Sequence, residues 1–378
     1  VGTQSLLANT TGTNNTAVGY QALTTNTTGS QNVGIGDGSL SANTTASNNV
    51  SVGYFSMDSN TTGTTNVAVG ASALRNNTTA SQNTAVGYQA GTSLTTGTNL
   101  VAIGYQAGDA ITVGNNNIAI GKNALGAEVS GSLNIAIGSN ALGVQNTGTD
   151  AYNVAIGYNA GTAVSTGINN VFIGGLAGTA NTTASQNTAV GYRSLASNTI
   201  GGNNVSVGYQ TLSANTEGTK NVGLGRQALS ANTTGSGSVG VGYNTLDANT
   251  TGSQNTALGR EALTANTTAS NNVGVGYVAL SANTTGTSNV AVGASALGAN
   301  TTASNNTAVG YTALEHNTTG TGNTSVGFRA GAENETGGSN TGLGQDALRF
   351  NTASSNNAVG YQALYSNTTG DENNSFGR

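Results

Sequence analysis

Few side chains in this sequence could do chemistry, and they do not gather. The only histidine is His316, and the chain has no cysteine. Without a second imidazole or a thiol, one chain offers neither a Ser-His-Asp arrangement nor a zinc site. The close acidic pairs are Glu333 with Glu335 and Asp371 with Glu372. Calcium-binding solenoid repeats instead need an aspartate in every unit. We therefore expect no catalytic, cofactor or metal site, and no enzyme.

One column of residues suits recognition better than catalysis. It follows a recurring glycine by one residue and holds 11 of the 13 tyrosines. Because Lys and Arg are rarely buried unpaired, Lys122, Arg226 and Arg260 indicate that the column reaches solvent. Tyrosine with arginine is typical of recognition surfaces and of stacking on saccharides. The simpler, favoured alternative is that the rings stack from repeat to repeat and only stabilise the flank. The candidate recognition stripe comprises Tyr20, Tyr54, Tyr88, Tyr105, Tyr158, Tyr192, Tyr209, Arg226, Tyr243, Arg260, Tyr277, Tyr311, Phe328 and Tyr361.

The composition of the chain excludes several functional classes. Charged residues make up 6% of the 378 residues, whereas an ordinary soluble domain has about a quarter. A net charge of -5 and the absence of proline are not typical of disorder. A mildly acidic chain is not expected to bind nucleic acid, and no apolar run is long enough for membrane insertion. Because the sequence starts at Val1, we expect it to be a piece of a longer protein.

A sequence repeat defines the structural units that must position these residues. A glycine after an apolar residue recurs from Gly2 to Gly377, and 20 of the 22 intervals equal 17 residues. The other two are 19, before Gly157, and 16, before Gly360. A 17-residue unit is too short for a helical repeat but matches one coil of a β-solenoid. The sequence therefore predicts an all-β parallel β-solenoid, or β-roll, of about 22 coils as a single array over residues 1–378.

Alternation before each glycine predicts a short strand and two core columns. In Val67-Ala68-Val69, apolar residues alternate with a small one, which is a period of two. We expect Val69 and its equivalents, immediately before the glycine, to form one core column. Leucine four residues after the glycine is expected to form the second. The small residue, here Ala68, is expected on the opposite face of the strand, close to another backbone. The leucine column comprises Leu23, Leu40, Leu74, Leu125, Leu195, Leu229, Leu263, Leu297 and Leu348.

This apolar supply is small for an isolated coil. Burying a valine or leucine stabilises by roughly 1.5 to 3 kcal/mol, while ordering each residue costs about 1 to 2 kcal/mol. Association of chains would bury more apolar surface and so offset the entropy cost of ordering. We therefore expect a homotrimer that buries the small-residue face. The absence of proline agrees, because every coil must donate hydrogen bonds to its neighbours.

Asparagine marks the predicted turn of each coil. It stands seven residues after the glycine at 17 positions, among them Asn26 and Asn60. Asparagine tolerates left-handed backbone, bonds its own chain in turns and can form amide ladders when stacked. Residues 91–180 form a variant segment, flanked by commoner Asn-Thr-Thr units over 1–90 and 181–378. In that segment the asparagine is replaced by Leu94, Ile111, Glu128, Gln145 and Val164. We interpret the replacement as a turn that is packed differently and buried.

Short motifs resemble two kinds of known repeat. The hexapeptides Asn99–Gly104, Asn116–Gly121 and Asn169–Gly174 resemble the N-S-V-A-I-G signature of the head repeats of trimeric autotransporter adhesins. The resemblance implies a left-handed β-roll of three chains around one axis that attaches bacteria to host matrix. The 17-residue period is longer than that family's usual unit. Units such as Asn83–Ala90 and Asn306–Leu314 are similar to repeats of bacteriophage tail-fibre proteins.

These observations favour a non-enzymatic attachment fibre. We expect the shaft or head of an extracellular homotrimeric fibre, favouring a phage tail fibre in a virion, that adheres to a cell-surface receptor, matrix or glycan. A trimeric autotransporter adhesin on a bacterial surface is the first alternative. An ice-binding solenoid is less favoured, because the adjacent threonines of Asn-Thr-Thr would point to opposite sides of an extended strand. An enzyme on a solenoid ranks third, because acids and bases are not clustered.

Overall fold

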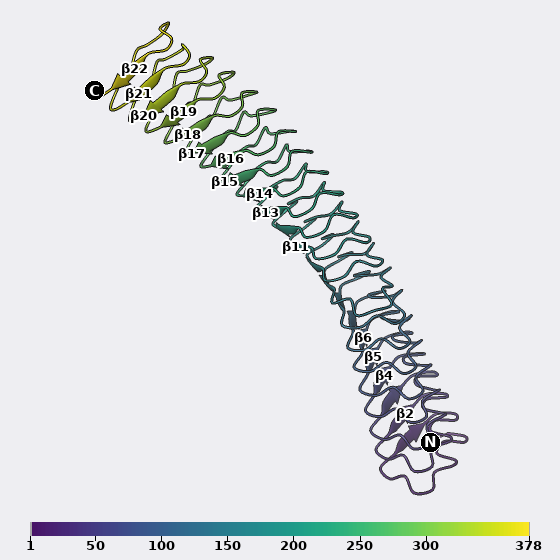
Figure 1. Ribbon diagram of the computed structural model, residues 1–378. Helices are drawn as coiled ribbons and strands as arrows, with labels where there is room; N and C mark the ends of the chain where they lie inside the picture. Colours follow the sequence, from purple (N-terminus) through teal and green to yellow (C-terminus); the bar gives the residue numbers. More distant parts are fainter. Residues whose placement is uncertain (1, 378) are drawn as a thin grey trace. The chain divides into compact units, whose positions relative to one another are not determined.

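The computed structural model describes residues 2–377 and shows an all-β parallel β-solenoid with a 17-residue repeat (Figure 1). Each coil contributes one strand of three residues, and the described residues contain no helix. The predicted fold class is thus confirmed. Two compact units divide between Asn187 and Thr188, and each is described by itself. The strands of the first unit are β1 (Thr16–Val18), β2 (Val33–Ile35), β3 (Val50–Val52), β4 (Val67–Val69), β5 (Thr84–Val86), β6 (Val101–Ile103), β7 (Ile118–Ile120), β8 (Ile135–Ile137), β9 (Val154–Ile156) and β10 (Val171–Ile173). Those of the second are β11 (Thr188–Val190), β12 (Val205–Val207), β13 (Val222–Leu224), β14 (Val239–Val241), β15 (Thr256–Leu258), β16 (Val273–Val275), β17 (Val290–Val292), β18 (Thr307–Val309), β19 (Thr324–Val326), β20 (Thr341–Leu343), β21 (Asn357–Val359) and β22 (Asn374–Phe376).

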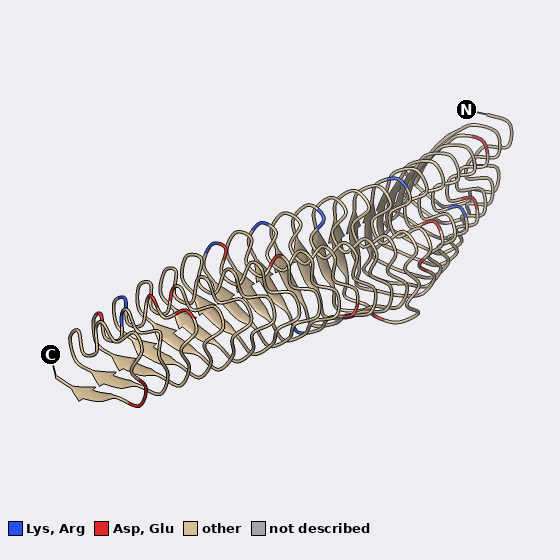
Figure 2. Ribbon diagram, turned by 90° about the horizontal axis from the view of Figure 1, so that it is seen from above, with Lys and Arg blue, Asp and Glu red and all other residues tan. Residues whose placement is uncertain are grey.

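Within each unit, successive strands pair in parallel, one repeat apart. Thr16 pairs with Val33, and the amide of Gly36 donates to the carbonyl of Val18 at 2.8 Å. The same register continues where the interval changes: β8 and β9 pair across 19 residues, and β20 and β21 across 16. The added and deleted residues therefore lie in loops, and the sheet remains continuous within each unit. Among residues 2–377, the charged residues lie on loops, and none occurs in a strand (Figure 2).

The interior of each coil is narrow, and the strand residues that face it are not the ones expected from the sequence. The central residue of the strands faces inward and is small in nearly all of them, as in the fully buried Ala68. The exception is Phe172 of β10, which is fully buried where Gly161 and Gly178 take the place of the leucine. The residue before the glycine faces outward, and Val18 is 42% exposed. The expected core column of Val69 and its equivalents is therefore wrong, and the small column belongs to the interior. The reason is steric, because a Cβ atom built on Gly34 would lie only 3.2 Å from Cγ of Leu23 on the opposite wall.

The leucine column is core, as predicted. Leu23 and Leu74 are fully buried. Their backbone is left-handed, with φ of 52° at Leu23, which is uncommon for any residue other than glycine. A hydrogen bond to the next coil stabilises the turn: the amide of Leu23 donates to the carbonyl of Ser39 at 3.0 Å. The leucine thus points into the lumen at a sharp bend.

The recurring glycine is required by a close approach of two coils. Gly19 has a φ of 133°, a region that side chains disfavour. A Cβ atom there would also lie 2.5 Å from the carbonyl oxygen of Gly36 in the next coil. No other residue fits such a position, which explains the regular recurrence that reveals the repeat.

The asparagine column forms a buried amide ladder. The Nδ2 group of Asn43 donates to Oδ1 of Asn26 at 2.8 Å and to the carbonyl of Ala46 at 3.1 Å. Asn60 continues the ladder by donating to Asn43 at 3.0 Å. The expected bond to the chain itself and the expected ladder are confirmed. The expected left-handed backbone is not at the ladder asparagine but five residues later, as at Gln31 after Asn26, where φ is 61°.

A second asparagine column, four residues before the glycine, was not singled out from the sequence. Oδ1 of Asn32 accepts the backbone amide of Asn49 in the next coil at 3.0 Å. Nδ2 of Asn32 donates to the carbonyl of Ala46 at 2.8 Å. Both asparagines are fully buried. Two polar ladders therefore line the coils that carry both asparagines, and most of their buried groups have partners inside the protein.

The substituted turn position of the variant segment is buried, as predicted. Leu94, Ile111 and Val164 are fully buried in place of the ladder asparagine. The ladder ends at this point, and Oδ1 of Asn77 is left buried without a hydrogen-bond partner in the described residues. In the second unit, the ladder runs from Asn198 to Asn317.

Glu128 takes over the ladder position before the 19-residue interval. Its buried carboxylate accepts hydrogen bonds from the amide of Gly131 at 2.7 Å and from Nε2 of Gln145 at 3.1 Å. The amide and hydroxyl of Thr147 donate to it at 3.1 and 3.2 Å. Oε1 of Gln145 in turn accepts from Asn153 at 2.9 Å. These longer side chains carry the hydrogen-bonded network across the enlarged loop.

Replacing one ladder asparagine should weaken the solenoid. Asn60→Ala removes the acceptor of Asn77 and leaves Oδ1 of Asn43 without its donor. Because each buried unsatisfied group costs about 1 to 3 kcal/mol, we expect a loss of about 2 to 5 kcal/mol. The urea midpoint followed by circular dichroism measures it. Thr62→Ala, at an exposed position of the same coil, is the matched control. Equal midpoints for the two variants would contradict the structural role of the ladder.

Candidate functional site

The candidate recognition stripe lies where each coil leaves the sheet. Every member follows the last residue of a strand by one glycine, so the column runs along one edge of the sheet in each unit. All fourteen residues are exposed, and the aromatic members range from 37% at Tyr243 to 61% at Tyr158. The inference that the column reaches solvent is therefore correct. Its role in recognition stays a prediction.

Rings in the first unit stack in part of the stripe. The centroids of Tyr88 and Tyr105 lie 5.4 Å apart with an interplanar angle of 17°. Tyr54 instead makes an edge contact of 4.3 Å with the neighbouring Phe55. The coil after Tyr105 places Lys122 in the column, which interrupts the aromatic surface.

The second unit carries a longer ladder of rings and guanidinium groups. Tyr192 and Tyr209 stack at 5.7 Å. Arg226 lies over Tyr209 at 5.8 Å and over Tyr243 at 5.4 Å. Arg260 lies over Tyr243 at 5.8 Å and over Tyr277 at 5.7 Å. Each such contact contributes about 0.5 to 1 kcal/mol at an exposed site. Repeat-to-repeat stacking is thus real here, and it also holds the side chains in a fixed, exposed row.

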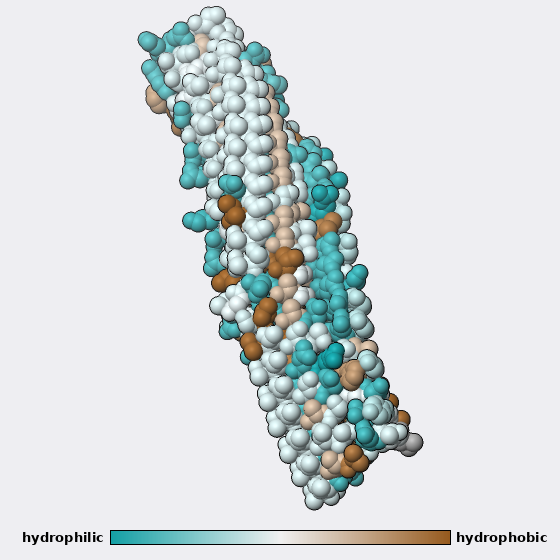
Figure 3. Space-filling model, turned by 90° about the vertical axis from the view of Figure 1, so that its right-hand side faces the viewer, coloured by the Kyte–Doolittle hydropathy of each residue, from teal (hydrophilic) through white to brown (hydrophobic). Residues whose placement is uncertain are grey.

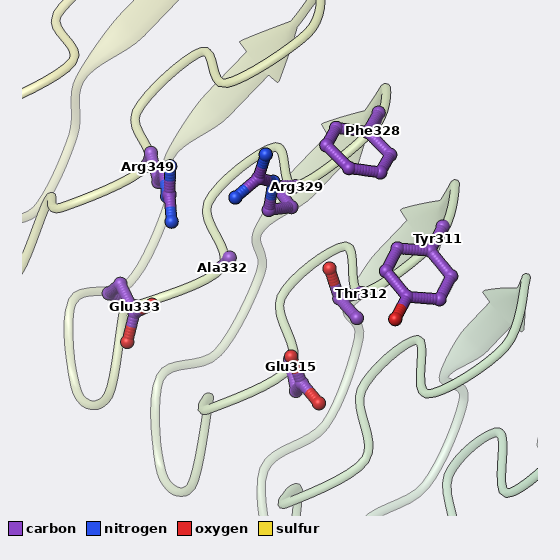
Figure 4. Close-up of a pocket in the computed structure, with 8 residues that line it drawn as sticks. All are labelled: Tyr311, Thr312, Glu315, Phe328, Arg329, Ala332, Glu333 and Arg349. Carbon is purple, nitrogen blue, oxygen red and sulfur yellow. The ribbon is translucent and has the colours of Figure 1, made fainter.

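A pocket opens beside the stripe near the C-terminal end of the second unit. After Ala294 the column continues with Tyr311 and Phe328, which stack at 5.5 Å and 12°. The adjoining pocket has a volume of about 370 Å³. Its lining comes from three successive coils and comprises Tyr311, Thr312, Glu315, Phe328, Arg329, Ala332, Glu333 and Arg349 (Figure 4).

Two arginines of the pocket are held by one buried carboxylate. Asp346 has a side chain only 5% exposed and lies 3.6 Å from Nε of Arg329 and 3.6 Å from Nη1 of Arg349. Arg329 also lies over the ring of Phe328 at 4.4 Å, and Arg349 donates to the hydroxyl of Tyr365 at 3.2 Å. The buried Nε atoms of both arginines have no hydrogen-bond partner in the described residues. One carboxylate thus serves two guanidinium groups.

The remaining polar groups of the pocket are acceptors or are unpaired. Thr312 is 6% exposed, and its buried hydroxyl has no hydrogen-bond partner in the described residues. Glu333 lies 3.6 Å from His316, and no ion pair of Glu315 occurs in residues 2–377. The sequence reasoning missed this pocket. The available signal was that six of the chain's charged residues fall within positions 315–349.

The structure offers limited chemistry elsewhere. No group of three potential metal ligands among His, Cys, Asp and Glu occurs in residues 2–377. Within the same residues, we find no helix with the length and apolar character needed to cross a bilayer. No protein-family model matches the chain, and no curated protein is similar to it.

Two carboxylates outside the pocket have shifted acidity. Both stand five residues after the recurring glycine, at Asp58 and Asp109. Burial raises the pKa of Asp58, against an opposing effect of Arg75, whose Nε lies 3.6 Å away. Burial also raises the pKa of Asp109, where only backbone hydrogen bonds oppose it. Asp109 is therefore the less compensated of the two.

The stability of the protein should depend on Asp109 in a defined pH window. Because its folded pKa lies above the ordinary value of 3.8, its contribution is fully present below that pH and is lost as the pH rises through the folded pKa. An asparagine side chain carries no charge at any pH, so Asp109→Asn should raise the urea midpoint at pH 7 and leave it nearly unchanged at pH 3. Asp58→Asn should raise the urea midpoint at pH 7 by less, because Arg75 already offsets part of the cost of burying the Asp58 carboxylate. A midpoint at pH 7 that does not rise in Asp109→Asn would contradict this effect of burial.

Proposed function

We propose that the chain is the shaft or head of a non-enzymatic, extracellular attachment fibre, built as a homotrimer and displaying the recognition stripe to a cell surface. The supporting observation is an exposed apolar sheet face. In each strand, the first and third residues face outward, and no strand contains a charged residue. On the first unit, the third-position residues exposed by 36% to 42% are Val18, Ile35, Val86, Ile103, Ile156 and Ile173.

The apolar sheet face is one of several faces of the coils. Figure 3 shows the right-hand side of Figure 1, which is largely near-white and teal, with a pale brown line and scattered strongly hydrophobic residues. Soluble monomers rarely expose contiguous apolar patches larger than a few hundred Å². A column of β-branched residues that continues over ten strands of the first unit is therefore a surface suited to burial.

A second copy of this chain fits the face best. Its apolar columns repeat once per coil, so only a partner with the same rise per coil would match them over many strands. The face offers no charge to select a charged partner. The expectation that association buries the small residues is corrected, because Ala68 and its equivalents face the lumen. The outer valines and isoleucines take that place in the proposed trimer, in agreement with the resemblance to trimeric head repeats.

The stripe suits attachment because it is exposed on the single chain and lies beside, not within, the proposed interface. Its residues lie at the strand ends, outside the apolar columns, and are exposed. A phage tail fibre in a virion remains the favoured setting, and a bacterial surface adhesin is the alternative. An ice-binding solenoid is less favoured, because the hydroxyl of the first threonine of the turn already has a hydrogen-bond partner within the protein. Thr61 donates to the carbonyl of Thr78 at 3.0 Å.

Charges on the outer sheet face should break the assembly and spare the coil. The triple variant Val52→Asp, Val69→Asp and Val86→Asp places three carboxylates on adjacent strands of the proposed interface. Sedimentation equilibrium should give about three times 36.9 kDa for the unmodified chain and a single chain for this variant. The matched control adds the same charges in the same coils at exposed turn positions and comprises Thr62→Asp, Thr79→Asp and Thr96→Asp. This control should stay trimeric, and a monomeric unmodified chain would contradict the proposal.

The attachment role and its setting can be separated by binding assays. Fluorescently labelled chain is applied to a panel of intact bacterial cells and to immobilised extracellular-matrix proteins. Retention on cells is the result expected of a tail fibre, whereas retention on matrix proteins supports the adhesin alternative. Retention on neither surface would overturn the attachment function.

A further inference from the structure

We propose that the pocket beside Tyr311 and Phe328 binds a neutral oligosaccharide, with one sugar ring in the pocket and the next beyond Glu315. The inference rests on the proposed attachment function only for the source of the glycan. The pocket itself lies within one chain, so its binding can be tested whether or not the chain assembles.

The size and walls of the pocket suit a single sugar ring. Its volume of about 370 Å³ is near the lower end of the range of about 300 to 1,000 Å³ for small-molecule sites. One wall is apolar, formed by the rings of Tyr311 and Phe328 with the methyl group of Ala332 nearby (Figure 4). A pyranose has apolar C–H groups that pack against such rings and hydroxyls that point elsewhere.

The polar groups select a neutral ligand rich in hydroxyls. Arg329 and Arg349 supply donors, and Glu315 and Glu333 supply acceptors. An anionic ligand would meet the two glutamates, and a cationic one would meet the two arginines. A hydroxyl both donates and accepts, so it can use both kinds of group at once. The mixture of charges around one small pocket therefore favours a neutral sugar.

An unsatisfied group inside the pocket points to a ligand independently. The hydroxyl of Thr312 is buried and has no hydrogen-bond partner in the described residues, although it lines the pocket. Buried polar groups in proteins normally have partners, and leaving one unpaired costs about 1 to 3 kcal/mol. A sugar hydroxyl in the pocket would supply the missing partner.

The site is preorganised. Asp346 and the ring of Phe328 hold Arg329, and Asp346 with Tyr365 holds Arg349. Fixing these long side chains before binding lowers the entropy cost that a ligand would otherwise meet. The same arrangement does not occur in the preceding coil, where Ala294, Ser295 and Ala299 replace the ring and the charged residues.

A neighbouring pocket extends the site in the direction of the earlier coils. It has a volume of about 260 Å³ and is lined by Val278, Ser281, Ser295, Gly298, Ala299, Glu315 and His316. Glu315 belongs to both pockets, so its carboxylate can accept hydroxyls from two successive sugar units. A disaccharide should therefore bind more tightly than a monosaccharide.

Saturation-transfer NMR on the full chain tests the proposal with defined probes. The probes are the methyl glycosides of glucose, galactose, mannose and N-acetylglucosamine, with cellobiose, lactose and mannobiose as disaccharides. We expect transfer to ring protons of at least one neutral probe, tighter binding of the matching disaccharide, and weaker binding of glucuronate and glucosamine. No transfer to any neutral probe, or a preference for a charged one, would overturn the proposal.

Variants locate the binding. Phe328→Ala and Glu315→Gln should each weaken binding about tenfold or more, because a wall and a charge-assisted acceptor are lost. Thr312→Val, which keeps the shape of the side chain, should weaken it several-fold. Tyr192→Ala removes an exposed ring at the equivalent position of a coil outside the pocket and should leave binding unchanged. Glu315→Gln and Thr312→Val preserve shape, so the test survives if Phe328→Ala fails to fold.

The outcomes separate this inference from the proposed function. Equal weakening by Tyr192→Ala and Phe328→Ala would assign saccharide binding to the whole stripe and overturn the pocket site. Retained cell attachment in a Glu315→Gln variant that no longer binds saccharide would overturn the cell surface as the source of the glycan and leave both the pocket site and the fibre proposal standing. Saccharide binding by a chain that stays monomeric would overturn the trimer and leave the pocket site intact.

Discussion

Hydrogen bonds between buried asparagine amides in successive coils are the interaction on which the rest of the structure depends. The lumen is too narrow for a conventional apolar core, because the small residue of the strand and the leucine of the opposite wall nearly touch, as Gly34 and Leu23 show. Each coil can therefore bury little more than one leucine and a few small side chains. The amides of Asn43 and Asn60 fill the remaining interior. The Nδ2 group of each donates to Oδ1 of the ladder asparagine in the preceding coil and to a backbone carbonyl in its own coil. Repetition makes this polar interior possible, since within each run of ladder coils the asparagines of neighbouring coils are identical partners, as Asn43 is for Asn60.

The narrow lumen also determines what the protein displays. The third residue of each strand, such as Val69, lies on the outer face of the sheet, where it forms an apolar column. The glycine that follows each strand permits a close coil-to-coil approach, and the next residue projects from the sheet edge into solvent. An interior of small, leucine and amide side chains, an apolar outer face and an aromatic edge are thus three consequences of one repeating unit. The first builds the coil, and we propose that the second joins chains and that the third recognises a surface.

The sequence predicts the solenoid, its period, the leucine column and the exposed stripe, because each depends on spacing that repeats over many coils. It does not predict which side of the strand faces inward. Alternation in Val67-Ala68-Val69 separates two faces but does not say which one lies inside, and the usual rule that larger apolar residues are buried gives the wrong answer in a lumen this narrow. Asn60 was expected at a turn for its backbone freedom and for an amide ladder; the ladder is present, but the left-handed backbone lies elsewhere in the coil. The burial of such an amide depends on the partner that only the stacked coils supply.

The pocket could be predicted only in part. A step of 17 residues brings Tyr311 beside Phe328, and Glu315 near Glu333, so the clustering of charge is present in the sequence. The burial of Thr312 and the sharing of Asp346 by two arginines are different, because they follow from left-handed bends, with φ of 50° at Thr312 and 55° at Asp346. Positive φ is uncommon for residues other than glycine, so the types of these two residues do not predict it. Three-dimensional structure was needed to find an unpaired hydroxyl in a small pocket.

The central claim is that the ladder amides are buried and hydrogen-bonded along the coils. Hydrogen exchange of side-chain amides, followed by NMR on chain labelled with ¹⁵N-asparagine, tests it most directly. The account predicts that the Nδ2 protons of Asn43 and Asn60 exchange as slowly as the backbone amides of the strands, while those of the exposed Asn14 exchange at once. Exchange of the ladder protons as fast as those of Asn14 would contradict it.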